Sequence, residues 1–165
     1  MSGEESGALP IAVIDLDGVV ADVRPRLVHI RGASRDWDRF FAGIPDDAVL
    51  AEGRAVVERL AADHEIVYLT GRPERTRRDT EGWLERHGLP RGRLFMRTER
   101  DRRPARMVKS RLLNELSRGR RIAVVVDDDA DVCAALEQAG WPVLLADWMP
   151  DDDVLRQAQE HQGRT

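Results

Sequence analysis

The sequence predicts an α/β fold in which a parallel sheet is covered by helices on both faces. Short apolar runs alternate with longer amphipathic stretches, which is the order typical of repeated βαβ units. The apolar runs are continuous rather than alternating, as expected for strands that are buried on both sides. The length of 165 residues suits one domain with a single hydrophobic core.

Five apolar runs are the expected strands. The run at 11–14 ends at Asp15, the run at 65–69 ends at Thr70, and the run at 122–126 ends in three aspartates. Two shorter runs, at 94–96 and 143–146, complete the expected sheet. In a sheet of this kind the functional crevice lies beyond the carboxyl ends of the strands, which is where these polar residues fall.

Helices are expected between the strands. The amphipathic stretches lie at about 48–62, 74–87, 104–116, 130–139 and 151–159. Gly88 and Gly140 stand where helix-ending glycines belong, and Pro104 suits a first helical turn. We expect residues 1–9 to form a flexible polar leader, 10–149 the folded domain and 150–165 a C-terminal helix and tail, with no chemistry at either end.

Composition excludes several classes of protein. The net charge of −4, from 26 basic and 30 acidic residues, argues against nucleic-acid binding through bulk charge. Cys133 is the only cysteine, so an internal disulfide and a multi-cysteine metal site are both excluded. No apolar run approaches the ~20 residues of a membrane span, and the start of the chain lacks the layout of a signal peptide. We therefore expect a cytoplasmic protein with no membrane partner.

The segment Asp15-Leu16-Asp17-Gly18 places two carboxylates directly after a buried strand, so both can point into one crevice. A carboxylate is a competent nucleophile toward phosphorus, and a second carboxylate can pass a proton to the leaving oxygen. Asp15 would attack, and Asp17 would act as acid and base. The alternative is that the two aspartates only cap a turn or a helix, as most such segments do.

Asp127, Asp128 and Asp129 end the run at 122–126, at the same edge of the expected sheet. Carboxylates gathered in one crevice repel each other and require a cation, and an all-oxygen site of few ligands favours Mg²⁺. Asp129 has a simpler interpretation than its neighbours, because it precedes an apolar helical run and is well placed as the N-cap.

Two further segments complete the candidate site. At Thr70-Gly71-Arg72 a hydroxyl and backbone N–H groups can hold phosphate oxygens, although an ordinary capped helix start is an equal alternative. Lys109 is the only lysine among 26 basic residues, so its position invites a role that arginine does not fill. A site of converging carboxylates and phosphate needs such a compact positive charge, whereas most helical lysines are simply solvated.

Together these segments resemble the four motifs of the haloacid dehalogenase superfamily: strand-Asp-Leu-Asp-Gly-Val-Val, strand-Thr-Gly-Arg, a downstream helical lysine, and strand-Asp-Asp. Their order and spacing both agree, and the similarity covers residues 11–148. The resemblance implies a Rossmann-like three-layer fold and Mg²⁺-dependent phosphoryl transfer through an aspartyl-phosphate. Dehalogenases of this superfamily lack the second aspartate, so the presence of Asp17 indicates a phosphatase or phosphotransferase.

The same resemblance implies a role for each motif residue. Asp15 would be the nucleophile and a metal ligand, and Asp17 would be the acid and base, with its backbone carbonyl on the metal. Thr70 would hold the phosphoryl group, Lys109 would steady it, and Gly71 and Arg72 would bind substrate. The remaining metal ligands would be Asp127 and, through a water, Asp128.

A narrower resemblance links residues 22–38, 94–97 and 102–109 to the phosphatase domain of polynucleotide kinase/phosphatase enzymes, which removes terminal 3′ phosphates from nucleic acid. There is no GxxxxGK[ST] loop of a kinase. The usual cap insertions have no room, which implies a minimal cap or none and an open site. We expect a basic rim for a nucleic-acid backbone or a nucleotide, made of Arg72, Arg97, Arg102, Arg103 and Arg106.

Three alternatives stay open at this point. The aromatic residues Trp37, Phe40 and Phe41 either stack a base or pack a flap onto the core. The substrate is either a nucleotide or polynucleotide phosphate end, or a small phosphorylated metabolite. A non-catalytic phosphate-binding module is the third possibility, which the intact motif residues argue against. No obligate protein partner is inferred.

Overall fold

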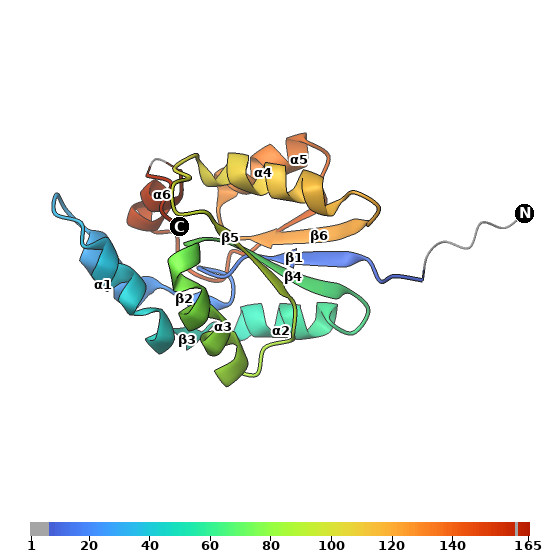
Figure 1. Cartoon of the computed structure of the whole chain (residues 1–165), viewed down its shortest axis with the longest axis horizontal. Coiled ribbons are helices and arrows are strands. Elements are labelled where there is room, and N and C mark those ends of the chain that lie inside the picture. The colour runs from blue at the N-terminus through green and yellow to red at the C-terminus, as the bar shows by residue number, and fades with distance from the viewer. Residues whose placement is uncertain (1–6, 161) are drawn as a thin grey trace, which may run out of the picture.

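The computed structural model describes residues 7–160 and 162–165, so most of the expected leader lies outside the described residues. At its centre is a fully parallel sheet with the strand order β5-β4-β1-β6-β7 (Figure 1). The strands are β1 (Ile11–Ile14), β4 (Glu65–Pro73), β5 (Arg93–Arg97), β6 (Ile122–Asp127) and β7 (Val143–Leu145). All five expected strands are present, and the predicted fold class is confirmed.

Helices cover both faces of this sheet (Figure 1). On one face lie α2 (Ala51–Leu60) and α3 (Arg77–Arg86), and on the other lie α4 (Ala105–Leu116) and α5 (Ala130–Gln138). Gly88 and Gly140 follow α3 and α5 with φ angles of +62° and +91°, the left-handed conformation expected of helix-ending glycines. Within the described part of the chain, no helix combines the length and the apolar character needed to cross a membrane.

The strands read as continuous apolar runs because successive side chains point to opposite faces and both faces are buried. In β1, Ala12 and Ile14 belong to the apolar cluster that includes Trp83 of α3. Val13 of the same strand belongs to the opposite cluster, which includes Leu113 of α4. The central strand is thus fixed from both sides, and so is the residue that follows it.

The helix expected at 48–62 begins later than predicted. The short strand β3 (Ala48–Val49) pairs antiparallel with β2 (Ala21–Asp22), and the Leu50 N–H then donates to the Val20 carbonyl at 2.9 Å. This pairing keeps residues 48–50 extended. The helix therefore starts only at Ala51.

The strand expected at 65–69 is longer than predicted. After a register shift beyond Leu69, β4 continues and pairs again at Pro73 with Arg97 of β5. A short 3₁₀ turn, η3 (Glu74–Thr76), then leads into α3. Thr70 consequently lies within the strand, and its interpretation as a helix cap is wrong.

A covering layer lies beyond the carboxyl ends of the strands (Figure 1). It consists of η1 (Arg24–Ile30), α1 (Trp37–Ala42), η2 (Ile44–Asp46) and α6 (Asp153–Glu160). Phe40 and Phe41 are buried in an apolar cluster of this layer, together with Leu155 of α6. The packing interpretation of these two phenylalanines is therefore confirmed, and the expectation of an open site is wrong because this layer covers it.

Candidate active site

The predicted motif residues come together at the carboxyl ends of three neighbouring strands. Asp15 follows β1 directly, Thr70 lies near the end of β4, and Asp127 is the last residue of β6. Lys109 reaches the same place from α4. All four side chains are enclosed, with relative exposures of 4% for Asp15, 2% for Thr70, 1% for Asp127 and 4% for Lys109.

Lys109 forms ion pairs with two of the motif carboxylates. Its Nζ lies 3.1 Å from Oδ2 of Asp15 and donates a hydrogen bond to Oδ2 of Asp127. Burial by itself lowers the pKa of a lysine, but the charges of Asp127 and Asp15 outweigh it and hold the pKa of Lys109 above its ordinary value. The interpretation of Lys109 as a solvated lysine is therefore wrong, because it is a buried, charged group between two carboxylates.

Three carboxylates form the acidic cluster: Asp15, Asp127 and Asp128. One oxygen from each lies within 4.8 Å of the others. When all three are ionised, three negative charges face the single positive charge of Lys109, which is an excess of two. Burial raises the pKa of Asp15, Lys109 offsets only part of that rise, and Asp127 adds to it. Burial, Asp15 and Asp127 likewise raise the pKa of Asp128.

The acidic cluster fits a divalent cation with oxygen ligands. Oδ1 of Asp128 is buried and accepts no hydrogen bond from the described residues. Oδ2 of Asp15 is also buried, and its contact with Lys109 is an ion pair without hydrogen-bond geometry. Carboxylate oxygens are the ligands that Mg²⁺ prefers, and its charge of two matches the excess in the cluster. Asp129 stands apart as the N-cap of α5, where Oδ1 accepts from Asp131 N at 2.9 Å, so its predicted capping role is confirmed.

Gly18 allows the first motif to pack against the acidic cluster. It turns the chain after Asp17 with a φ of +80°, a conformation that other residues rarely adopt. A Cβ atom at this position would also overlap the carboxylate of Asp128. The turn of the first motif therefore packs directly against the carboxylate of Asp128 in the last motif, and only glycine leaves room for this contact.

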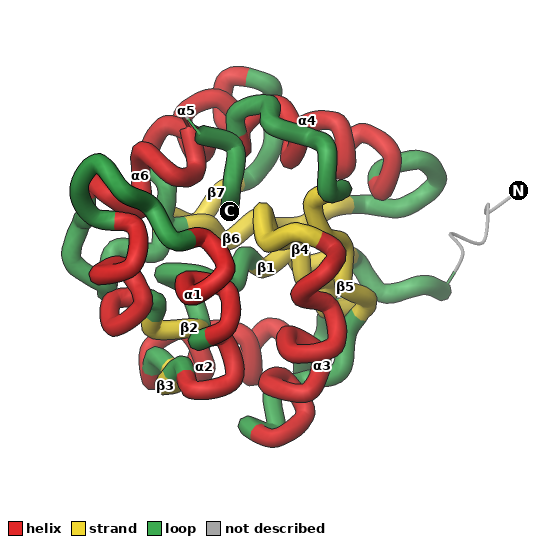
Figure 2. The backbone as a smooth tube through the Cα atoms, turned by 60° about the vertical axis from the view of Figure 1, so that its left-hand side comes forward, coloured by secondary structure: helices red, strands yellow, loops and turns green. Residues whose placement is uncertain are grey.

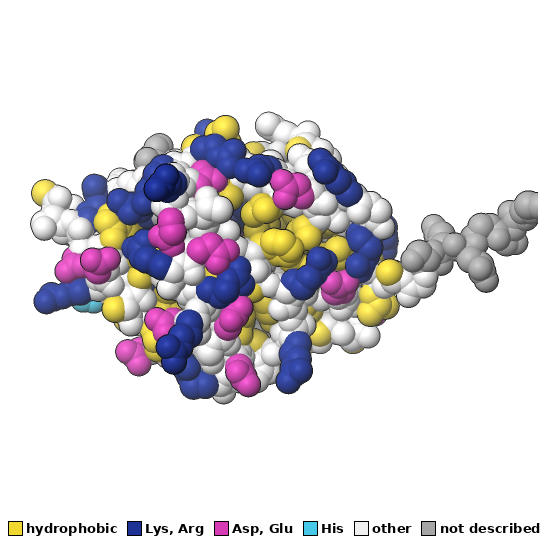
Figure 3. All heavy atoms as spheres, in the orientation of Figure 1, with side chains coloured by type: hydrophobic (Ala, Val, Ile, Leu, Met, Phe, Trp, Pro, Cys, Tyr) yellow, Lys and Arg dark blue, Asp and Glu magenta, His cyan; other side chains and the backbone are white. Residues whose placement is uncertain are grey.

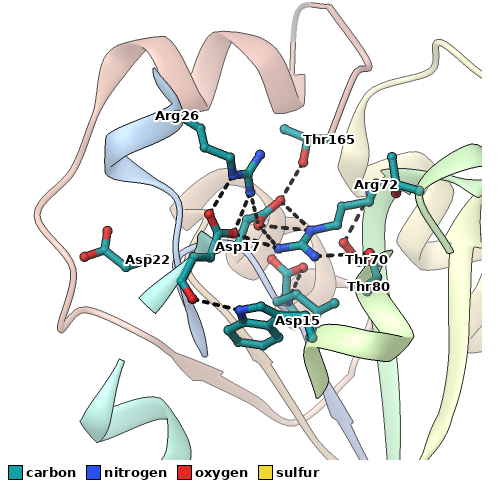
Figure 4. A network of polar contacts seen from close by, with 12 residues as sticks. Asp15, Asp17, Asp22, Arg26, Thr70, Arg72, Thr80 and Thr165 are labelled. Carbon is teal, nitrogen blue, oxygen red and sulfur yellow. Dashed lines mark hydrogen bonds and ion pairs between the residues drawn. The ribbon is translucent and has the colours of Figure 1, made fainter. Parts of the chain in front are cut away.

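Asp17 belongs to a second charged group, which Figure 4 shows. Its Oδ1 accepts from Nη2 of Arg72 at 2.6 Å and from Nη2 of Arg26 at 3.1 Å. Burial alone raises the pKa of Asp17, but the charges of Arg72 and Arg26 outweigh it and hold the pKa well below the ordinary value. Asp17 is thus a buried carboxylate fixed by two guanidinium groups.

Asp47 completes this second group, which we call the arginine cluster: Asp17, Asp47, Arg26 and Arg72. Nε of Arg26 donates to Asp47 Oδ1 at 2.7 Å, and Nη2 of Arg72 donates to Asp47 Oδ2 at 3.3 Å. Burial raises the pKa of Asp47 to about 6, and Arg26 and Arg72 act against that rise. Two negative and two positive charges are therefore matched within the protein.

Thr165, the last residue of the sequence, lies in the site. Its side-chain hydroxyl donates to Oδ2 of Asp17 at 2.9 Å, and the residue is 3% exposed (Figure 4). Its backbone passes so close to Gly71 that a Cβ atom at position 71 would overlap it. The expectation that the C-terminal tail carries no part of the site is wrong for this residue.

The expected basic rim is only partly present. Arg72 and Arg97 are 0% and 1% exposed, so neither belongs to a rim. Arg72 holds Asp17, while Nε of Arg97 donates to the Gly71 carbonyl at 3.1 Å. Arg102, Arg103 and Arg106 are exposed, as predicted. On the face drawn in Figure 3, basic side chains are interspersed with acidic ones.

Sequence reasoning missed three residues of the site: Arg26, Asp47 and Thr165. Arg26 lies in a 3₁₀ turn next to a proline, and Asp47 follows another such turn. Neither position follows a predicted strand, which was the signal that identified the other site residues. A buried arginine between two predicted core segments has no local pattern that distinguishes it from a surface arginine.

Comparisons with known proteins agree with this geometry. The family model of the polynucleotide kinase PNKP phosphatase domain matches residues 10–147. No curated protein matches the chain by sequence. One similar solved structure is a chain of the Pnkp1/Rnl/Hen1 RNA repair complex, with 19% identity and a TM-score of 0.68 over 88% of this chain and 45% of that chain. This chain therefore spans about half the length of that relative.

Other similar structures share the fold at lower identity. A HAD-superfamily hydrolase from Geobacter sulfurreducens has 15% identity and a TM-score of 0.55, with 94% and 97% of the two chains covered. YfnB from Bacillus subtilis, described as a HAD-hydrolase bound to magnesium, has 8% identity and a TM-score of 0.57, with 84% and 88% covered. At these identities the shared feature is the arrangement of the sheet and its helices.

Proposed function

The chain belongs to the family of the polynucleotide kinase PNKP phosphatase domain and is a phosphatase of the haloacid dehalogenase type, and from this premise we propose that it hydrolyses phosphate monoesters through an aspartyl-phosphate on Asp15. The observation that carries the proposal is the placement of Asp15 beside Lys109 within the acidic cluster. We expect it to act in the cytoplasm.

Mg²⁺ is the proposed cofactor. The residues that would hold it are Asp15, Asp127 and Asp128, with the backbone carbonyl of Asp17 as a further ligand. When bound, the ion supplies positive charge that lets a phosphate dianion approach these carboxylates. YfnB, a protein of the same fold, is described as bound to magnesium. The uncompensated charge of the acidic cluster supports the same assignment.

The proposed reaction has two steps at phosphorus. First, a carboxylate oxygen of Asp15 forms a bond to phosphorus while the ester P–O bond breaks, and Asp17 gives a proton to the departing oxygen. Asp17 would have to take up this proton from solvent beforehand, because Arg72 and Arg26 hold its pKa well below the ordinary value in the structure described. Second, Asp17 takes a proton from a water molecule as that water attacks phosphorus. The bond between phosphorus and Asp15 then breaks, which releases inorganic phosphate and restores both aspartates.

The neighbouring groups would hold the phosphoryl group during both steps. Lys109 would balance its charge and keep Asp15 in position for attack. Thr70 and the backbone N–H of Gly71 would bind its oxygens. Arg72 and Arg26 would orient Asp17, since both guanidinium groups already bind that carboxylate.

We propose that the substrate is a phosphorylated polynucleotide end or a nucleotide, and that 3′-phosphorylated ends are preferred. The family supports this substrate, and so does a groove of about 430 Å³ whose lining includes residues 34–38 and Arg75. The half-exposed side chain of Arg75 supplies positive charge on this lining that attracts a phosphodiester backbone.

A small phosphorylated metabolite is the second candidate substrate. The observation that favours it is the enclosure of the site, where Asp15 and Asp17 are only 4% and 2% exposed. A narrow entrance admits a compact ester more readily than a nucleic-acid strand.

The test is a substrate panel with Mg²⁺. It contains 3′-phosphorylated and 5′-phosphorylated oligonucleotides of one sequence, mononucleotides and sugar phosphates, and phosphate release is measured for each. We expect the 3′-phosphorylated oligonucleotide to be preferred, and chelation to stop its hydrolysis until Mg²⁺ is returned. Preference for sugar phosphates would favour the second candidate, and full activity in excess chelator would contradict the metal-dependent mechanism.

A further inference from the structure

The C-terminal segment, residues 162–165, lies across the site. Figure 2 shows the C-terminus beside the ends of the strands, next to α6. The segment folds back from α6, since the Arg164 N–H donates to the Ala158 carbonyl at 2.9 Å. The guanidinium of Arg164 lies over the ring of Trp37, 5.2 Å from its centroid. Gly163 sits against the backbone of Arg102 with a φ of +57°.

With this segment in place, both carboxylate oxygens of Asp17 are engaged. Oδ1 accepts from Arg26 and Arg72, and Oδ2 accepts from the Thr165 hydroxyl at 2.9 Å and, over a longer distance of 3.3 Å, from Nε of Arg72. A carboxylate in this state has no oxygen directed at a leaving group. Of these partners only Thr165 lies outside the arginine cluster, whereas both arginines are held within it.

The segment also fills the space where phosphate would bind. The backbone of Thr165 lies against Gly71, next to Thr70, whose hydroxyl is directed at the Arg72 N–H at 3.2 Å. Under the proposed function, Thr70 and Gly71 hold phosphoryl oxygens. Thr165 and a phosphoryl group cannot occupy this space together.

We propose that residues 162–165 form an inhibitory segment that must leave the site before a phosphate ester can bind. This inference rests on the proposed function. It adds a regulatory contact to the same site, in which the protein's own chain competes with the substrate.

The contacts of the segment suit a reversible closure. A single cation–π contact such as that of Arg164 with Trp37 is weak at a partly exposed site. α6 itself is fixed separately, because Leu155 and Ala158 are buried in the covering layer. The segment can therefore leave while α6 keeps its place.

The first experiment compares the full chain with a variant that lacks residues 162–165. We expect kcat/KM for a 3′-phosphorylated oligonucleotide to rise about tenfold, since the competent form is then always populated. Gly163→Ala should give a smaller rise without shortening the chain, because its Cβ would overlap the Arg102 backbone. Gly119→Ala is the matched control, with a φ of +77° and nothing within 4 Å. An unchanged or lower kcat/KM in both site variants would overturn the proposal.

The second experiment follows binding without turnover. Amide hydrogen exchange is measured with Mg²⁺ and inorganic phosphate, which should protect β4 and increase exchange at 162–165 in the full chain. Phosphate should bind the shortened variant more tightly. Protection of β4 without faster exchange at 162–165, or no binding to either chain, would contradict the inference. If both chains bind phosphate but hydrolyse no ester, the proposed function fails while the exchange result still decides this inference.

Discussion

Two groups of buried charges lie side by side after β1, and they differ in how far their positive charges compensate their negative ones. The arginine cluster matches two carboxylates with two guanidinium groups. The acidic cluster sets three carboxylates against Lys109 alone. The two groups are joined through the short segment between Asp15 and Asp17, so neighbouring residues of one motif have opposite surroundings.

This difference in charge compensation indicates that the arginine cluster holds its side chains in place and that the acidic cluster binds a cation. A balanced buried group holds its side chains in place, and removing one partner leaves a charge without compensation. An unbalanced group is destabilising for the protein alone, and it becomes favourable only when a cation joins it. The same type of substitution, aspartate to asparagine, should therefore have opposite effects on folding stability in the two clusters.

The largest expected effect is on catalysis in the acidic cluster. Asp15→Asn should lower phosphate release by about 10⁴-fold or more, since an amide cannot form the acyl-phosphate. The folded state should survive, which circular dichroism and the melting temperature would show. A purified variant with wild-type turnover would mean that the reaction does not pass through Asp15.

The next effect concerns stability in the arginine cluster. Asp17→Asn leaves Arg26 and Arg72 with one carboxylate, and should lower the free energy of unfolding by about 3–5 kcal/mol. Thermal and urea unfolding would measure it. Asp22→Asn is the control, because Asp22 pairs with Arg24 at the surface and its loss should change stability little. Equal stability of the two variants would contradict the structural role of the cluster.

Lys109 offers a test of geometry at constant charge. Lys109→Arg should fail nearly as badly as Lys109→Ala, with a loss of about 10²-fold or more in rate, or about 3 kcal/mol of transition-state stabilisation. The bulk and fork geometry of a guanidinium would be the reason, because the compact ammonium of Lys109 is buried between Asp15 and Asp127. Steady-state rates of variants with matched melting temperatures decide the point, and a fully active arginine variant would show that charge alone suffices.

The smallest expected effect is a gain in folding stability, whereas the Asp17 substitution causes a loss. Asp128→Asn removes one of three mutually repelling carboxylates, so the metal-free protein should gain about 1 kcal/mol of stability while it loses stabilisation by added Mg²⁺. Melting temperatures with and without Mg²⁺ measure both changes. Asp131→Asn, an exposed aspartate on α5, should alter neither. Loss of stability in the metal-free Asp128 variant would argue that the acidic cluster is not under repulsion.

The acidic cluster was predictable because its information is local. Asp15 and Asp127 each stand at the end of an apolar run, and parallel strands bring their carboxyl ends to one edge. The prediction for Lys109 rested only on its being the single lysine of the sequence and on its place on a helix after the third strand. Each of these inferences depends on residues within one segment of the chain.

The arginine cluster was not predictable in the same way, because its contacts join distant segments. Arg26 meets Asp47 across 21 residues, Arg72 meets Asp17 across 55, and Thr165 meets Asp17 across 148. Arg26 lies in one 3₁₀ turn of the covering layer and Asp47 directly follows another, and such short turns have weak periodic patterns. The buried arginines therefore look like surface arginines until the fold brings them together.

The close approach of Gly18 to Asp128 has a consequence for sequence variation in this family. A side chain at position 18 would need the space that the Asp128 carboxylate occupies, as well as a strained backbone. Relatives that replace this glycine should therefore also carry a shorter or displaced residue at the position of Asp128. The two positions, which belong to the first and the last motif of the chain, should vary together rather than independently.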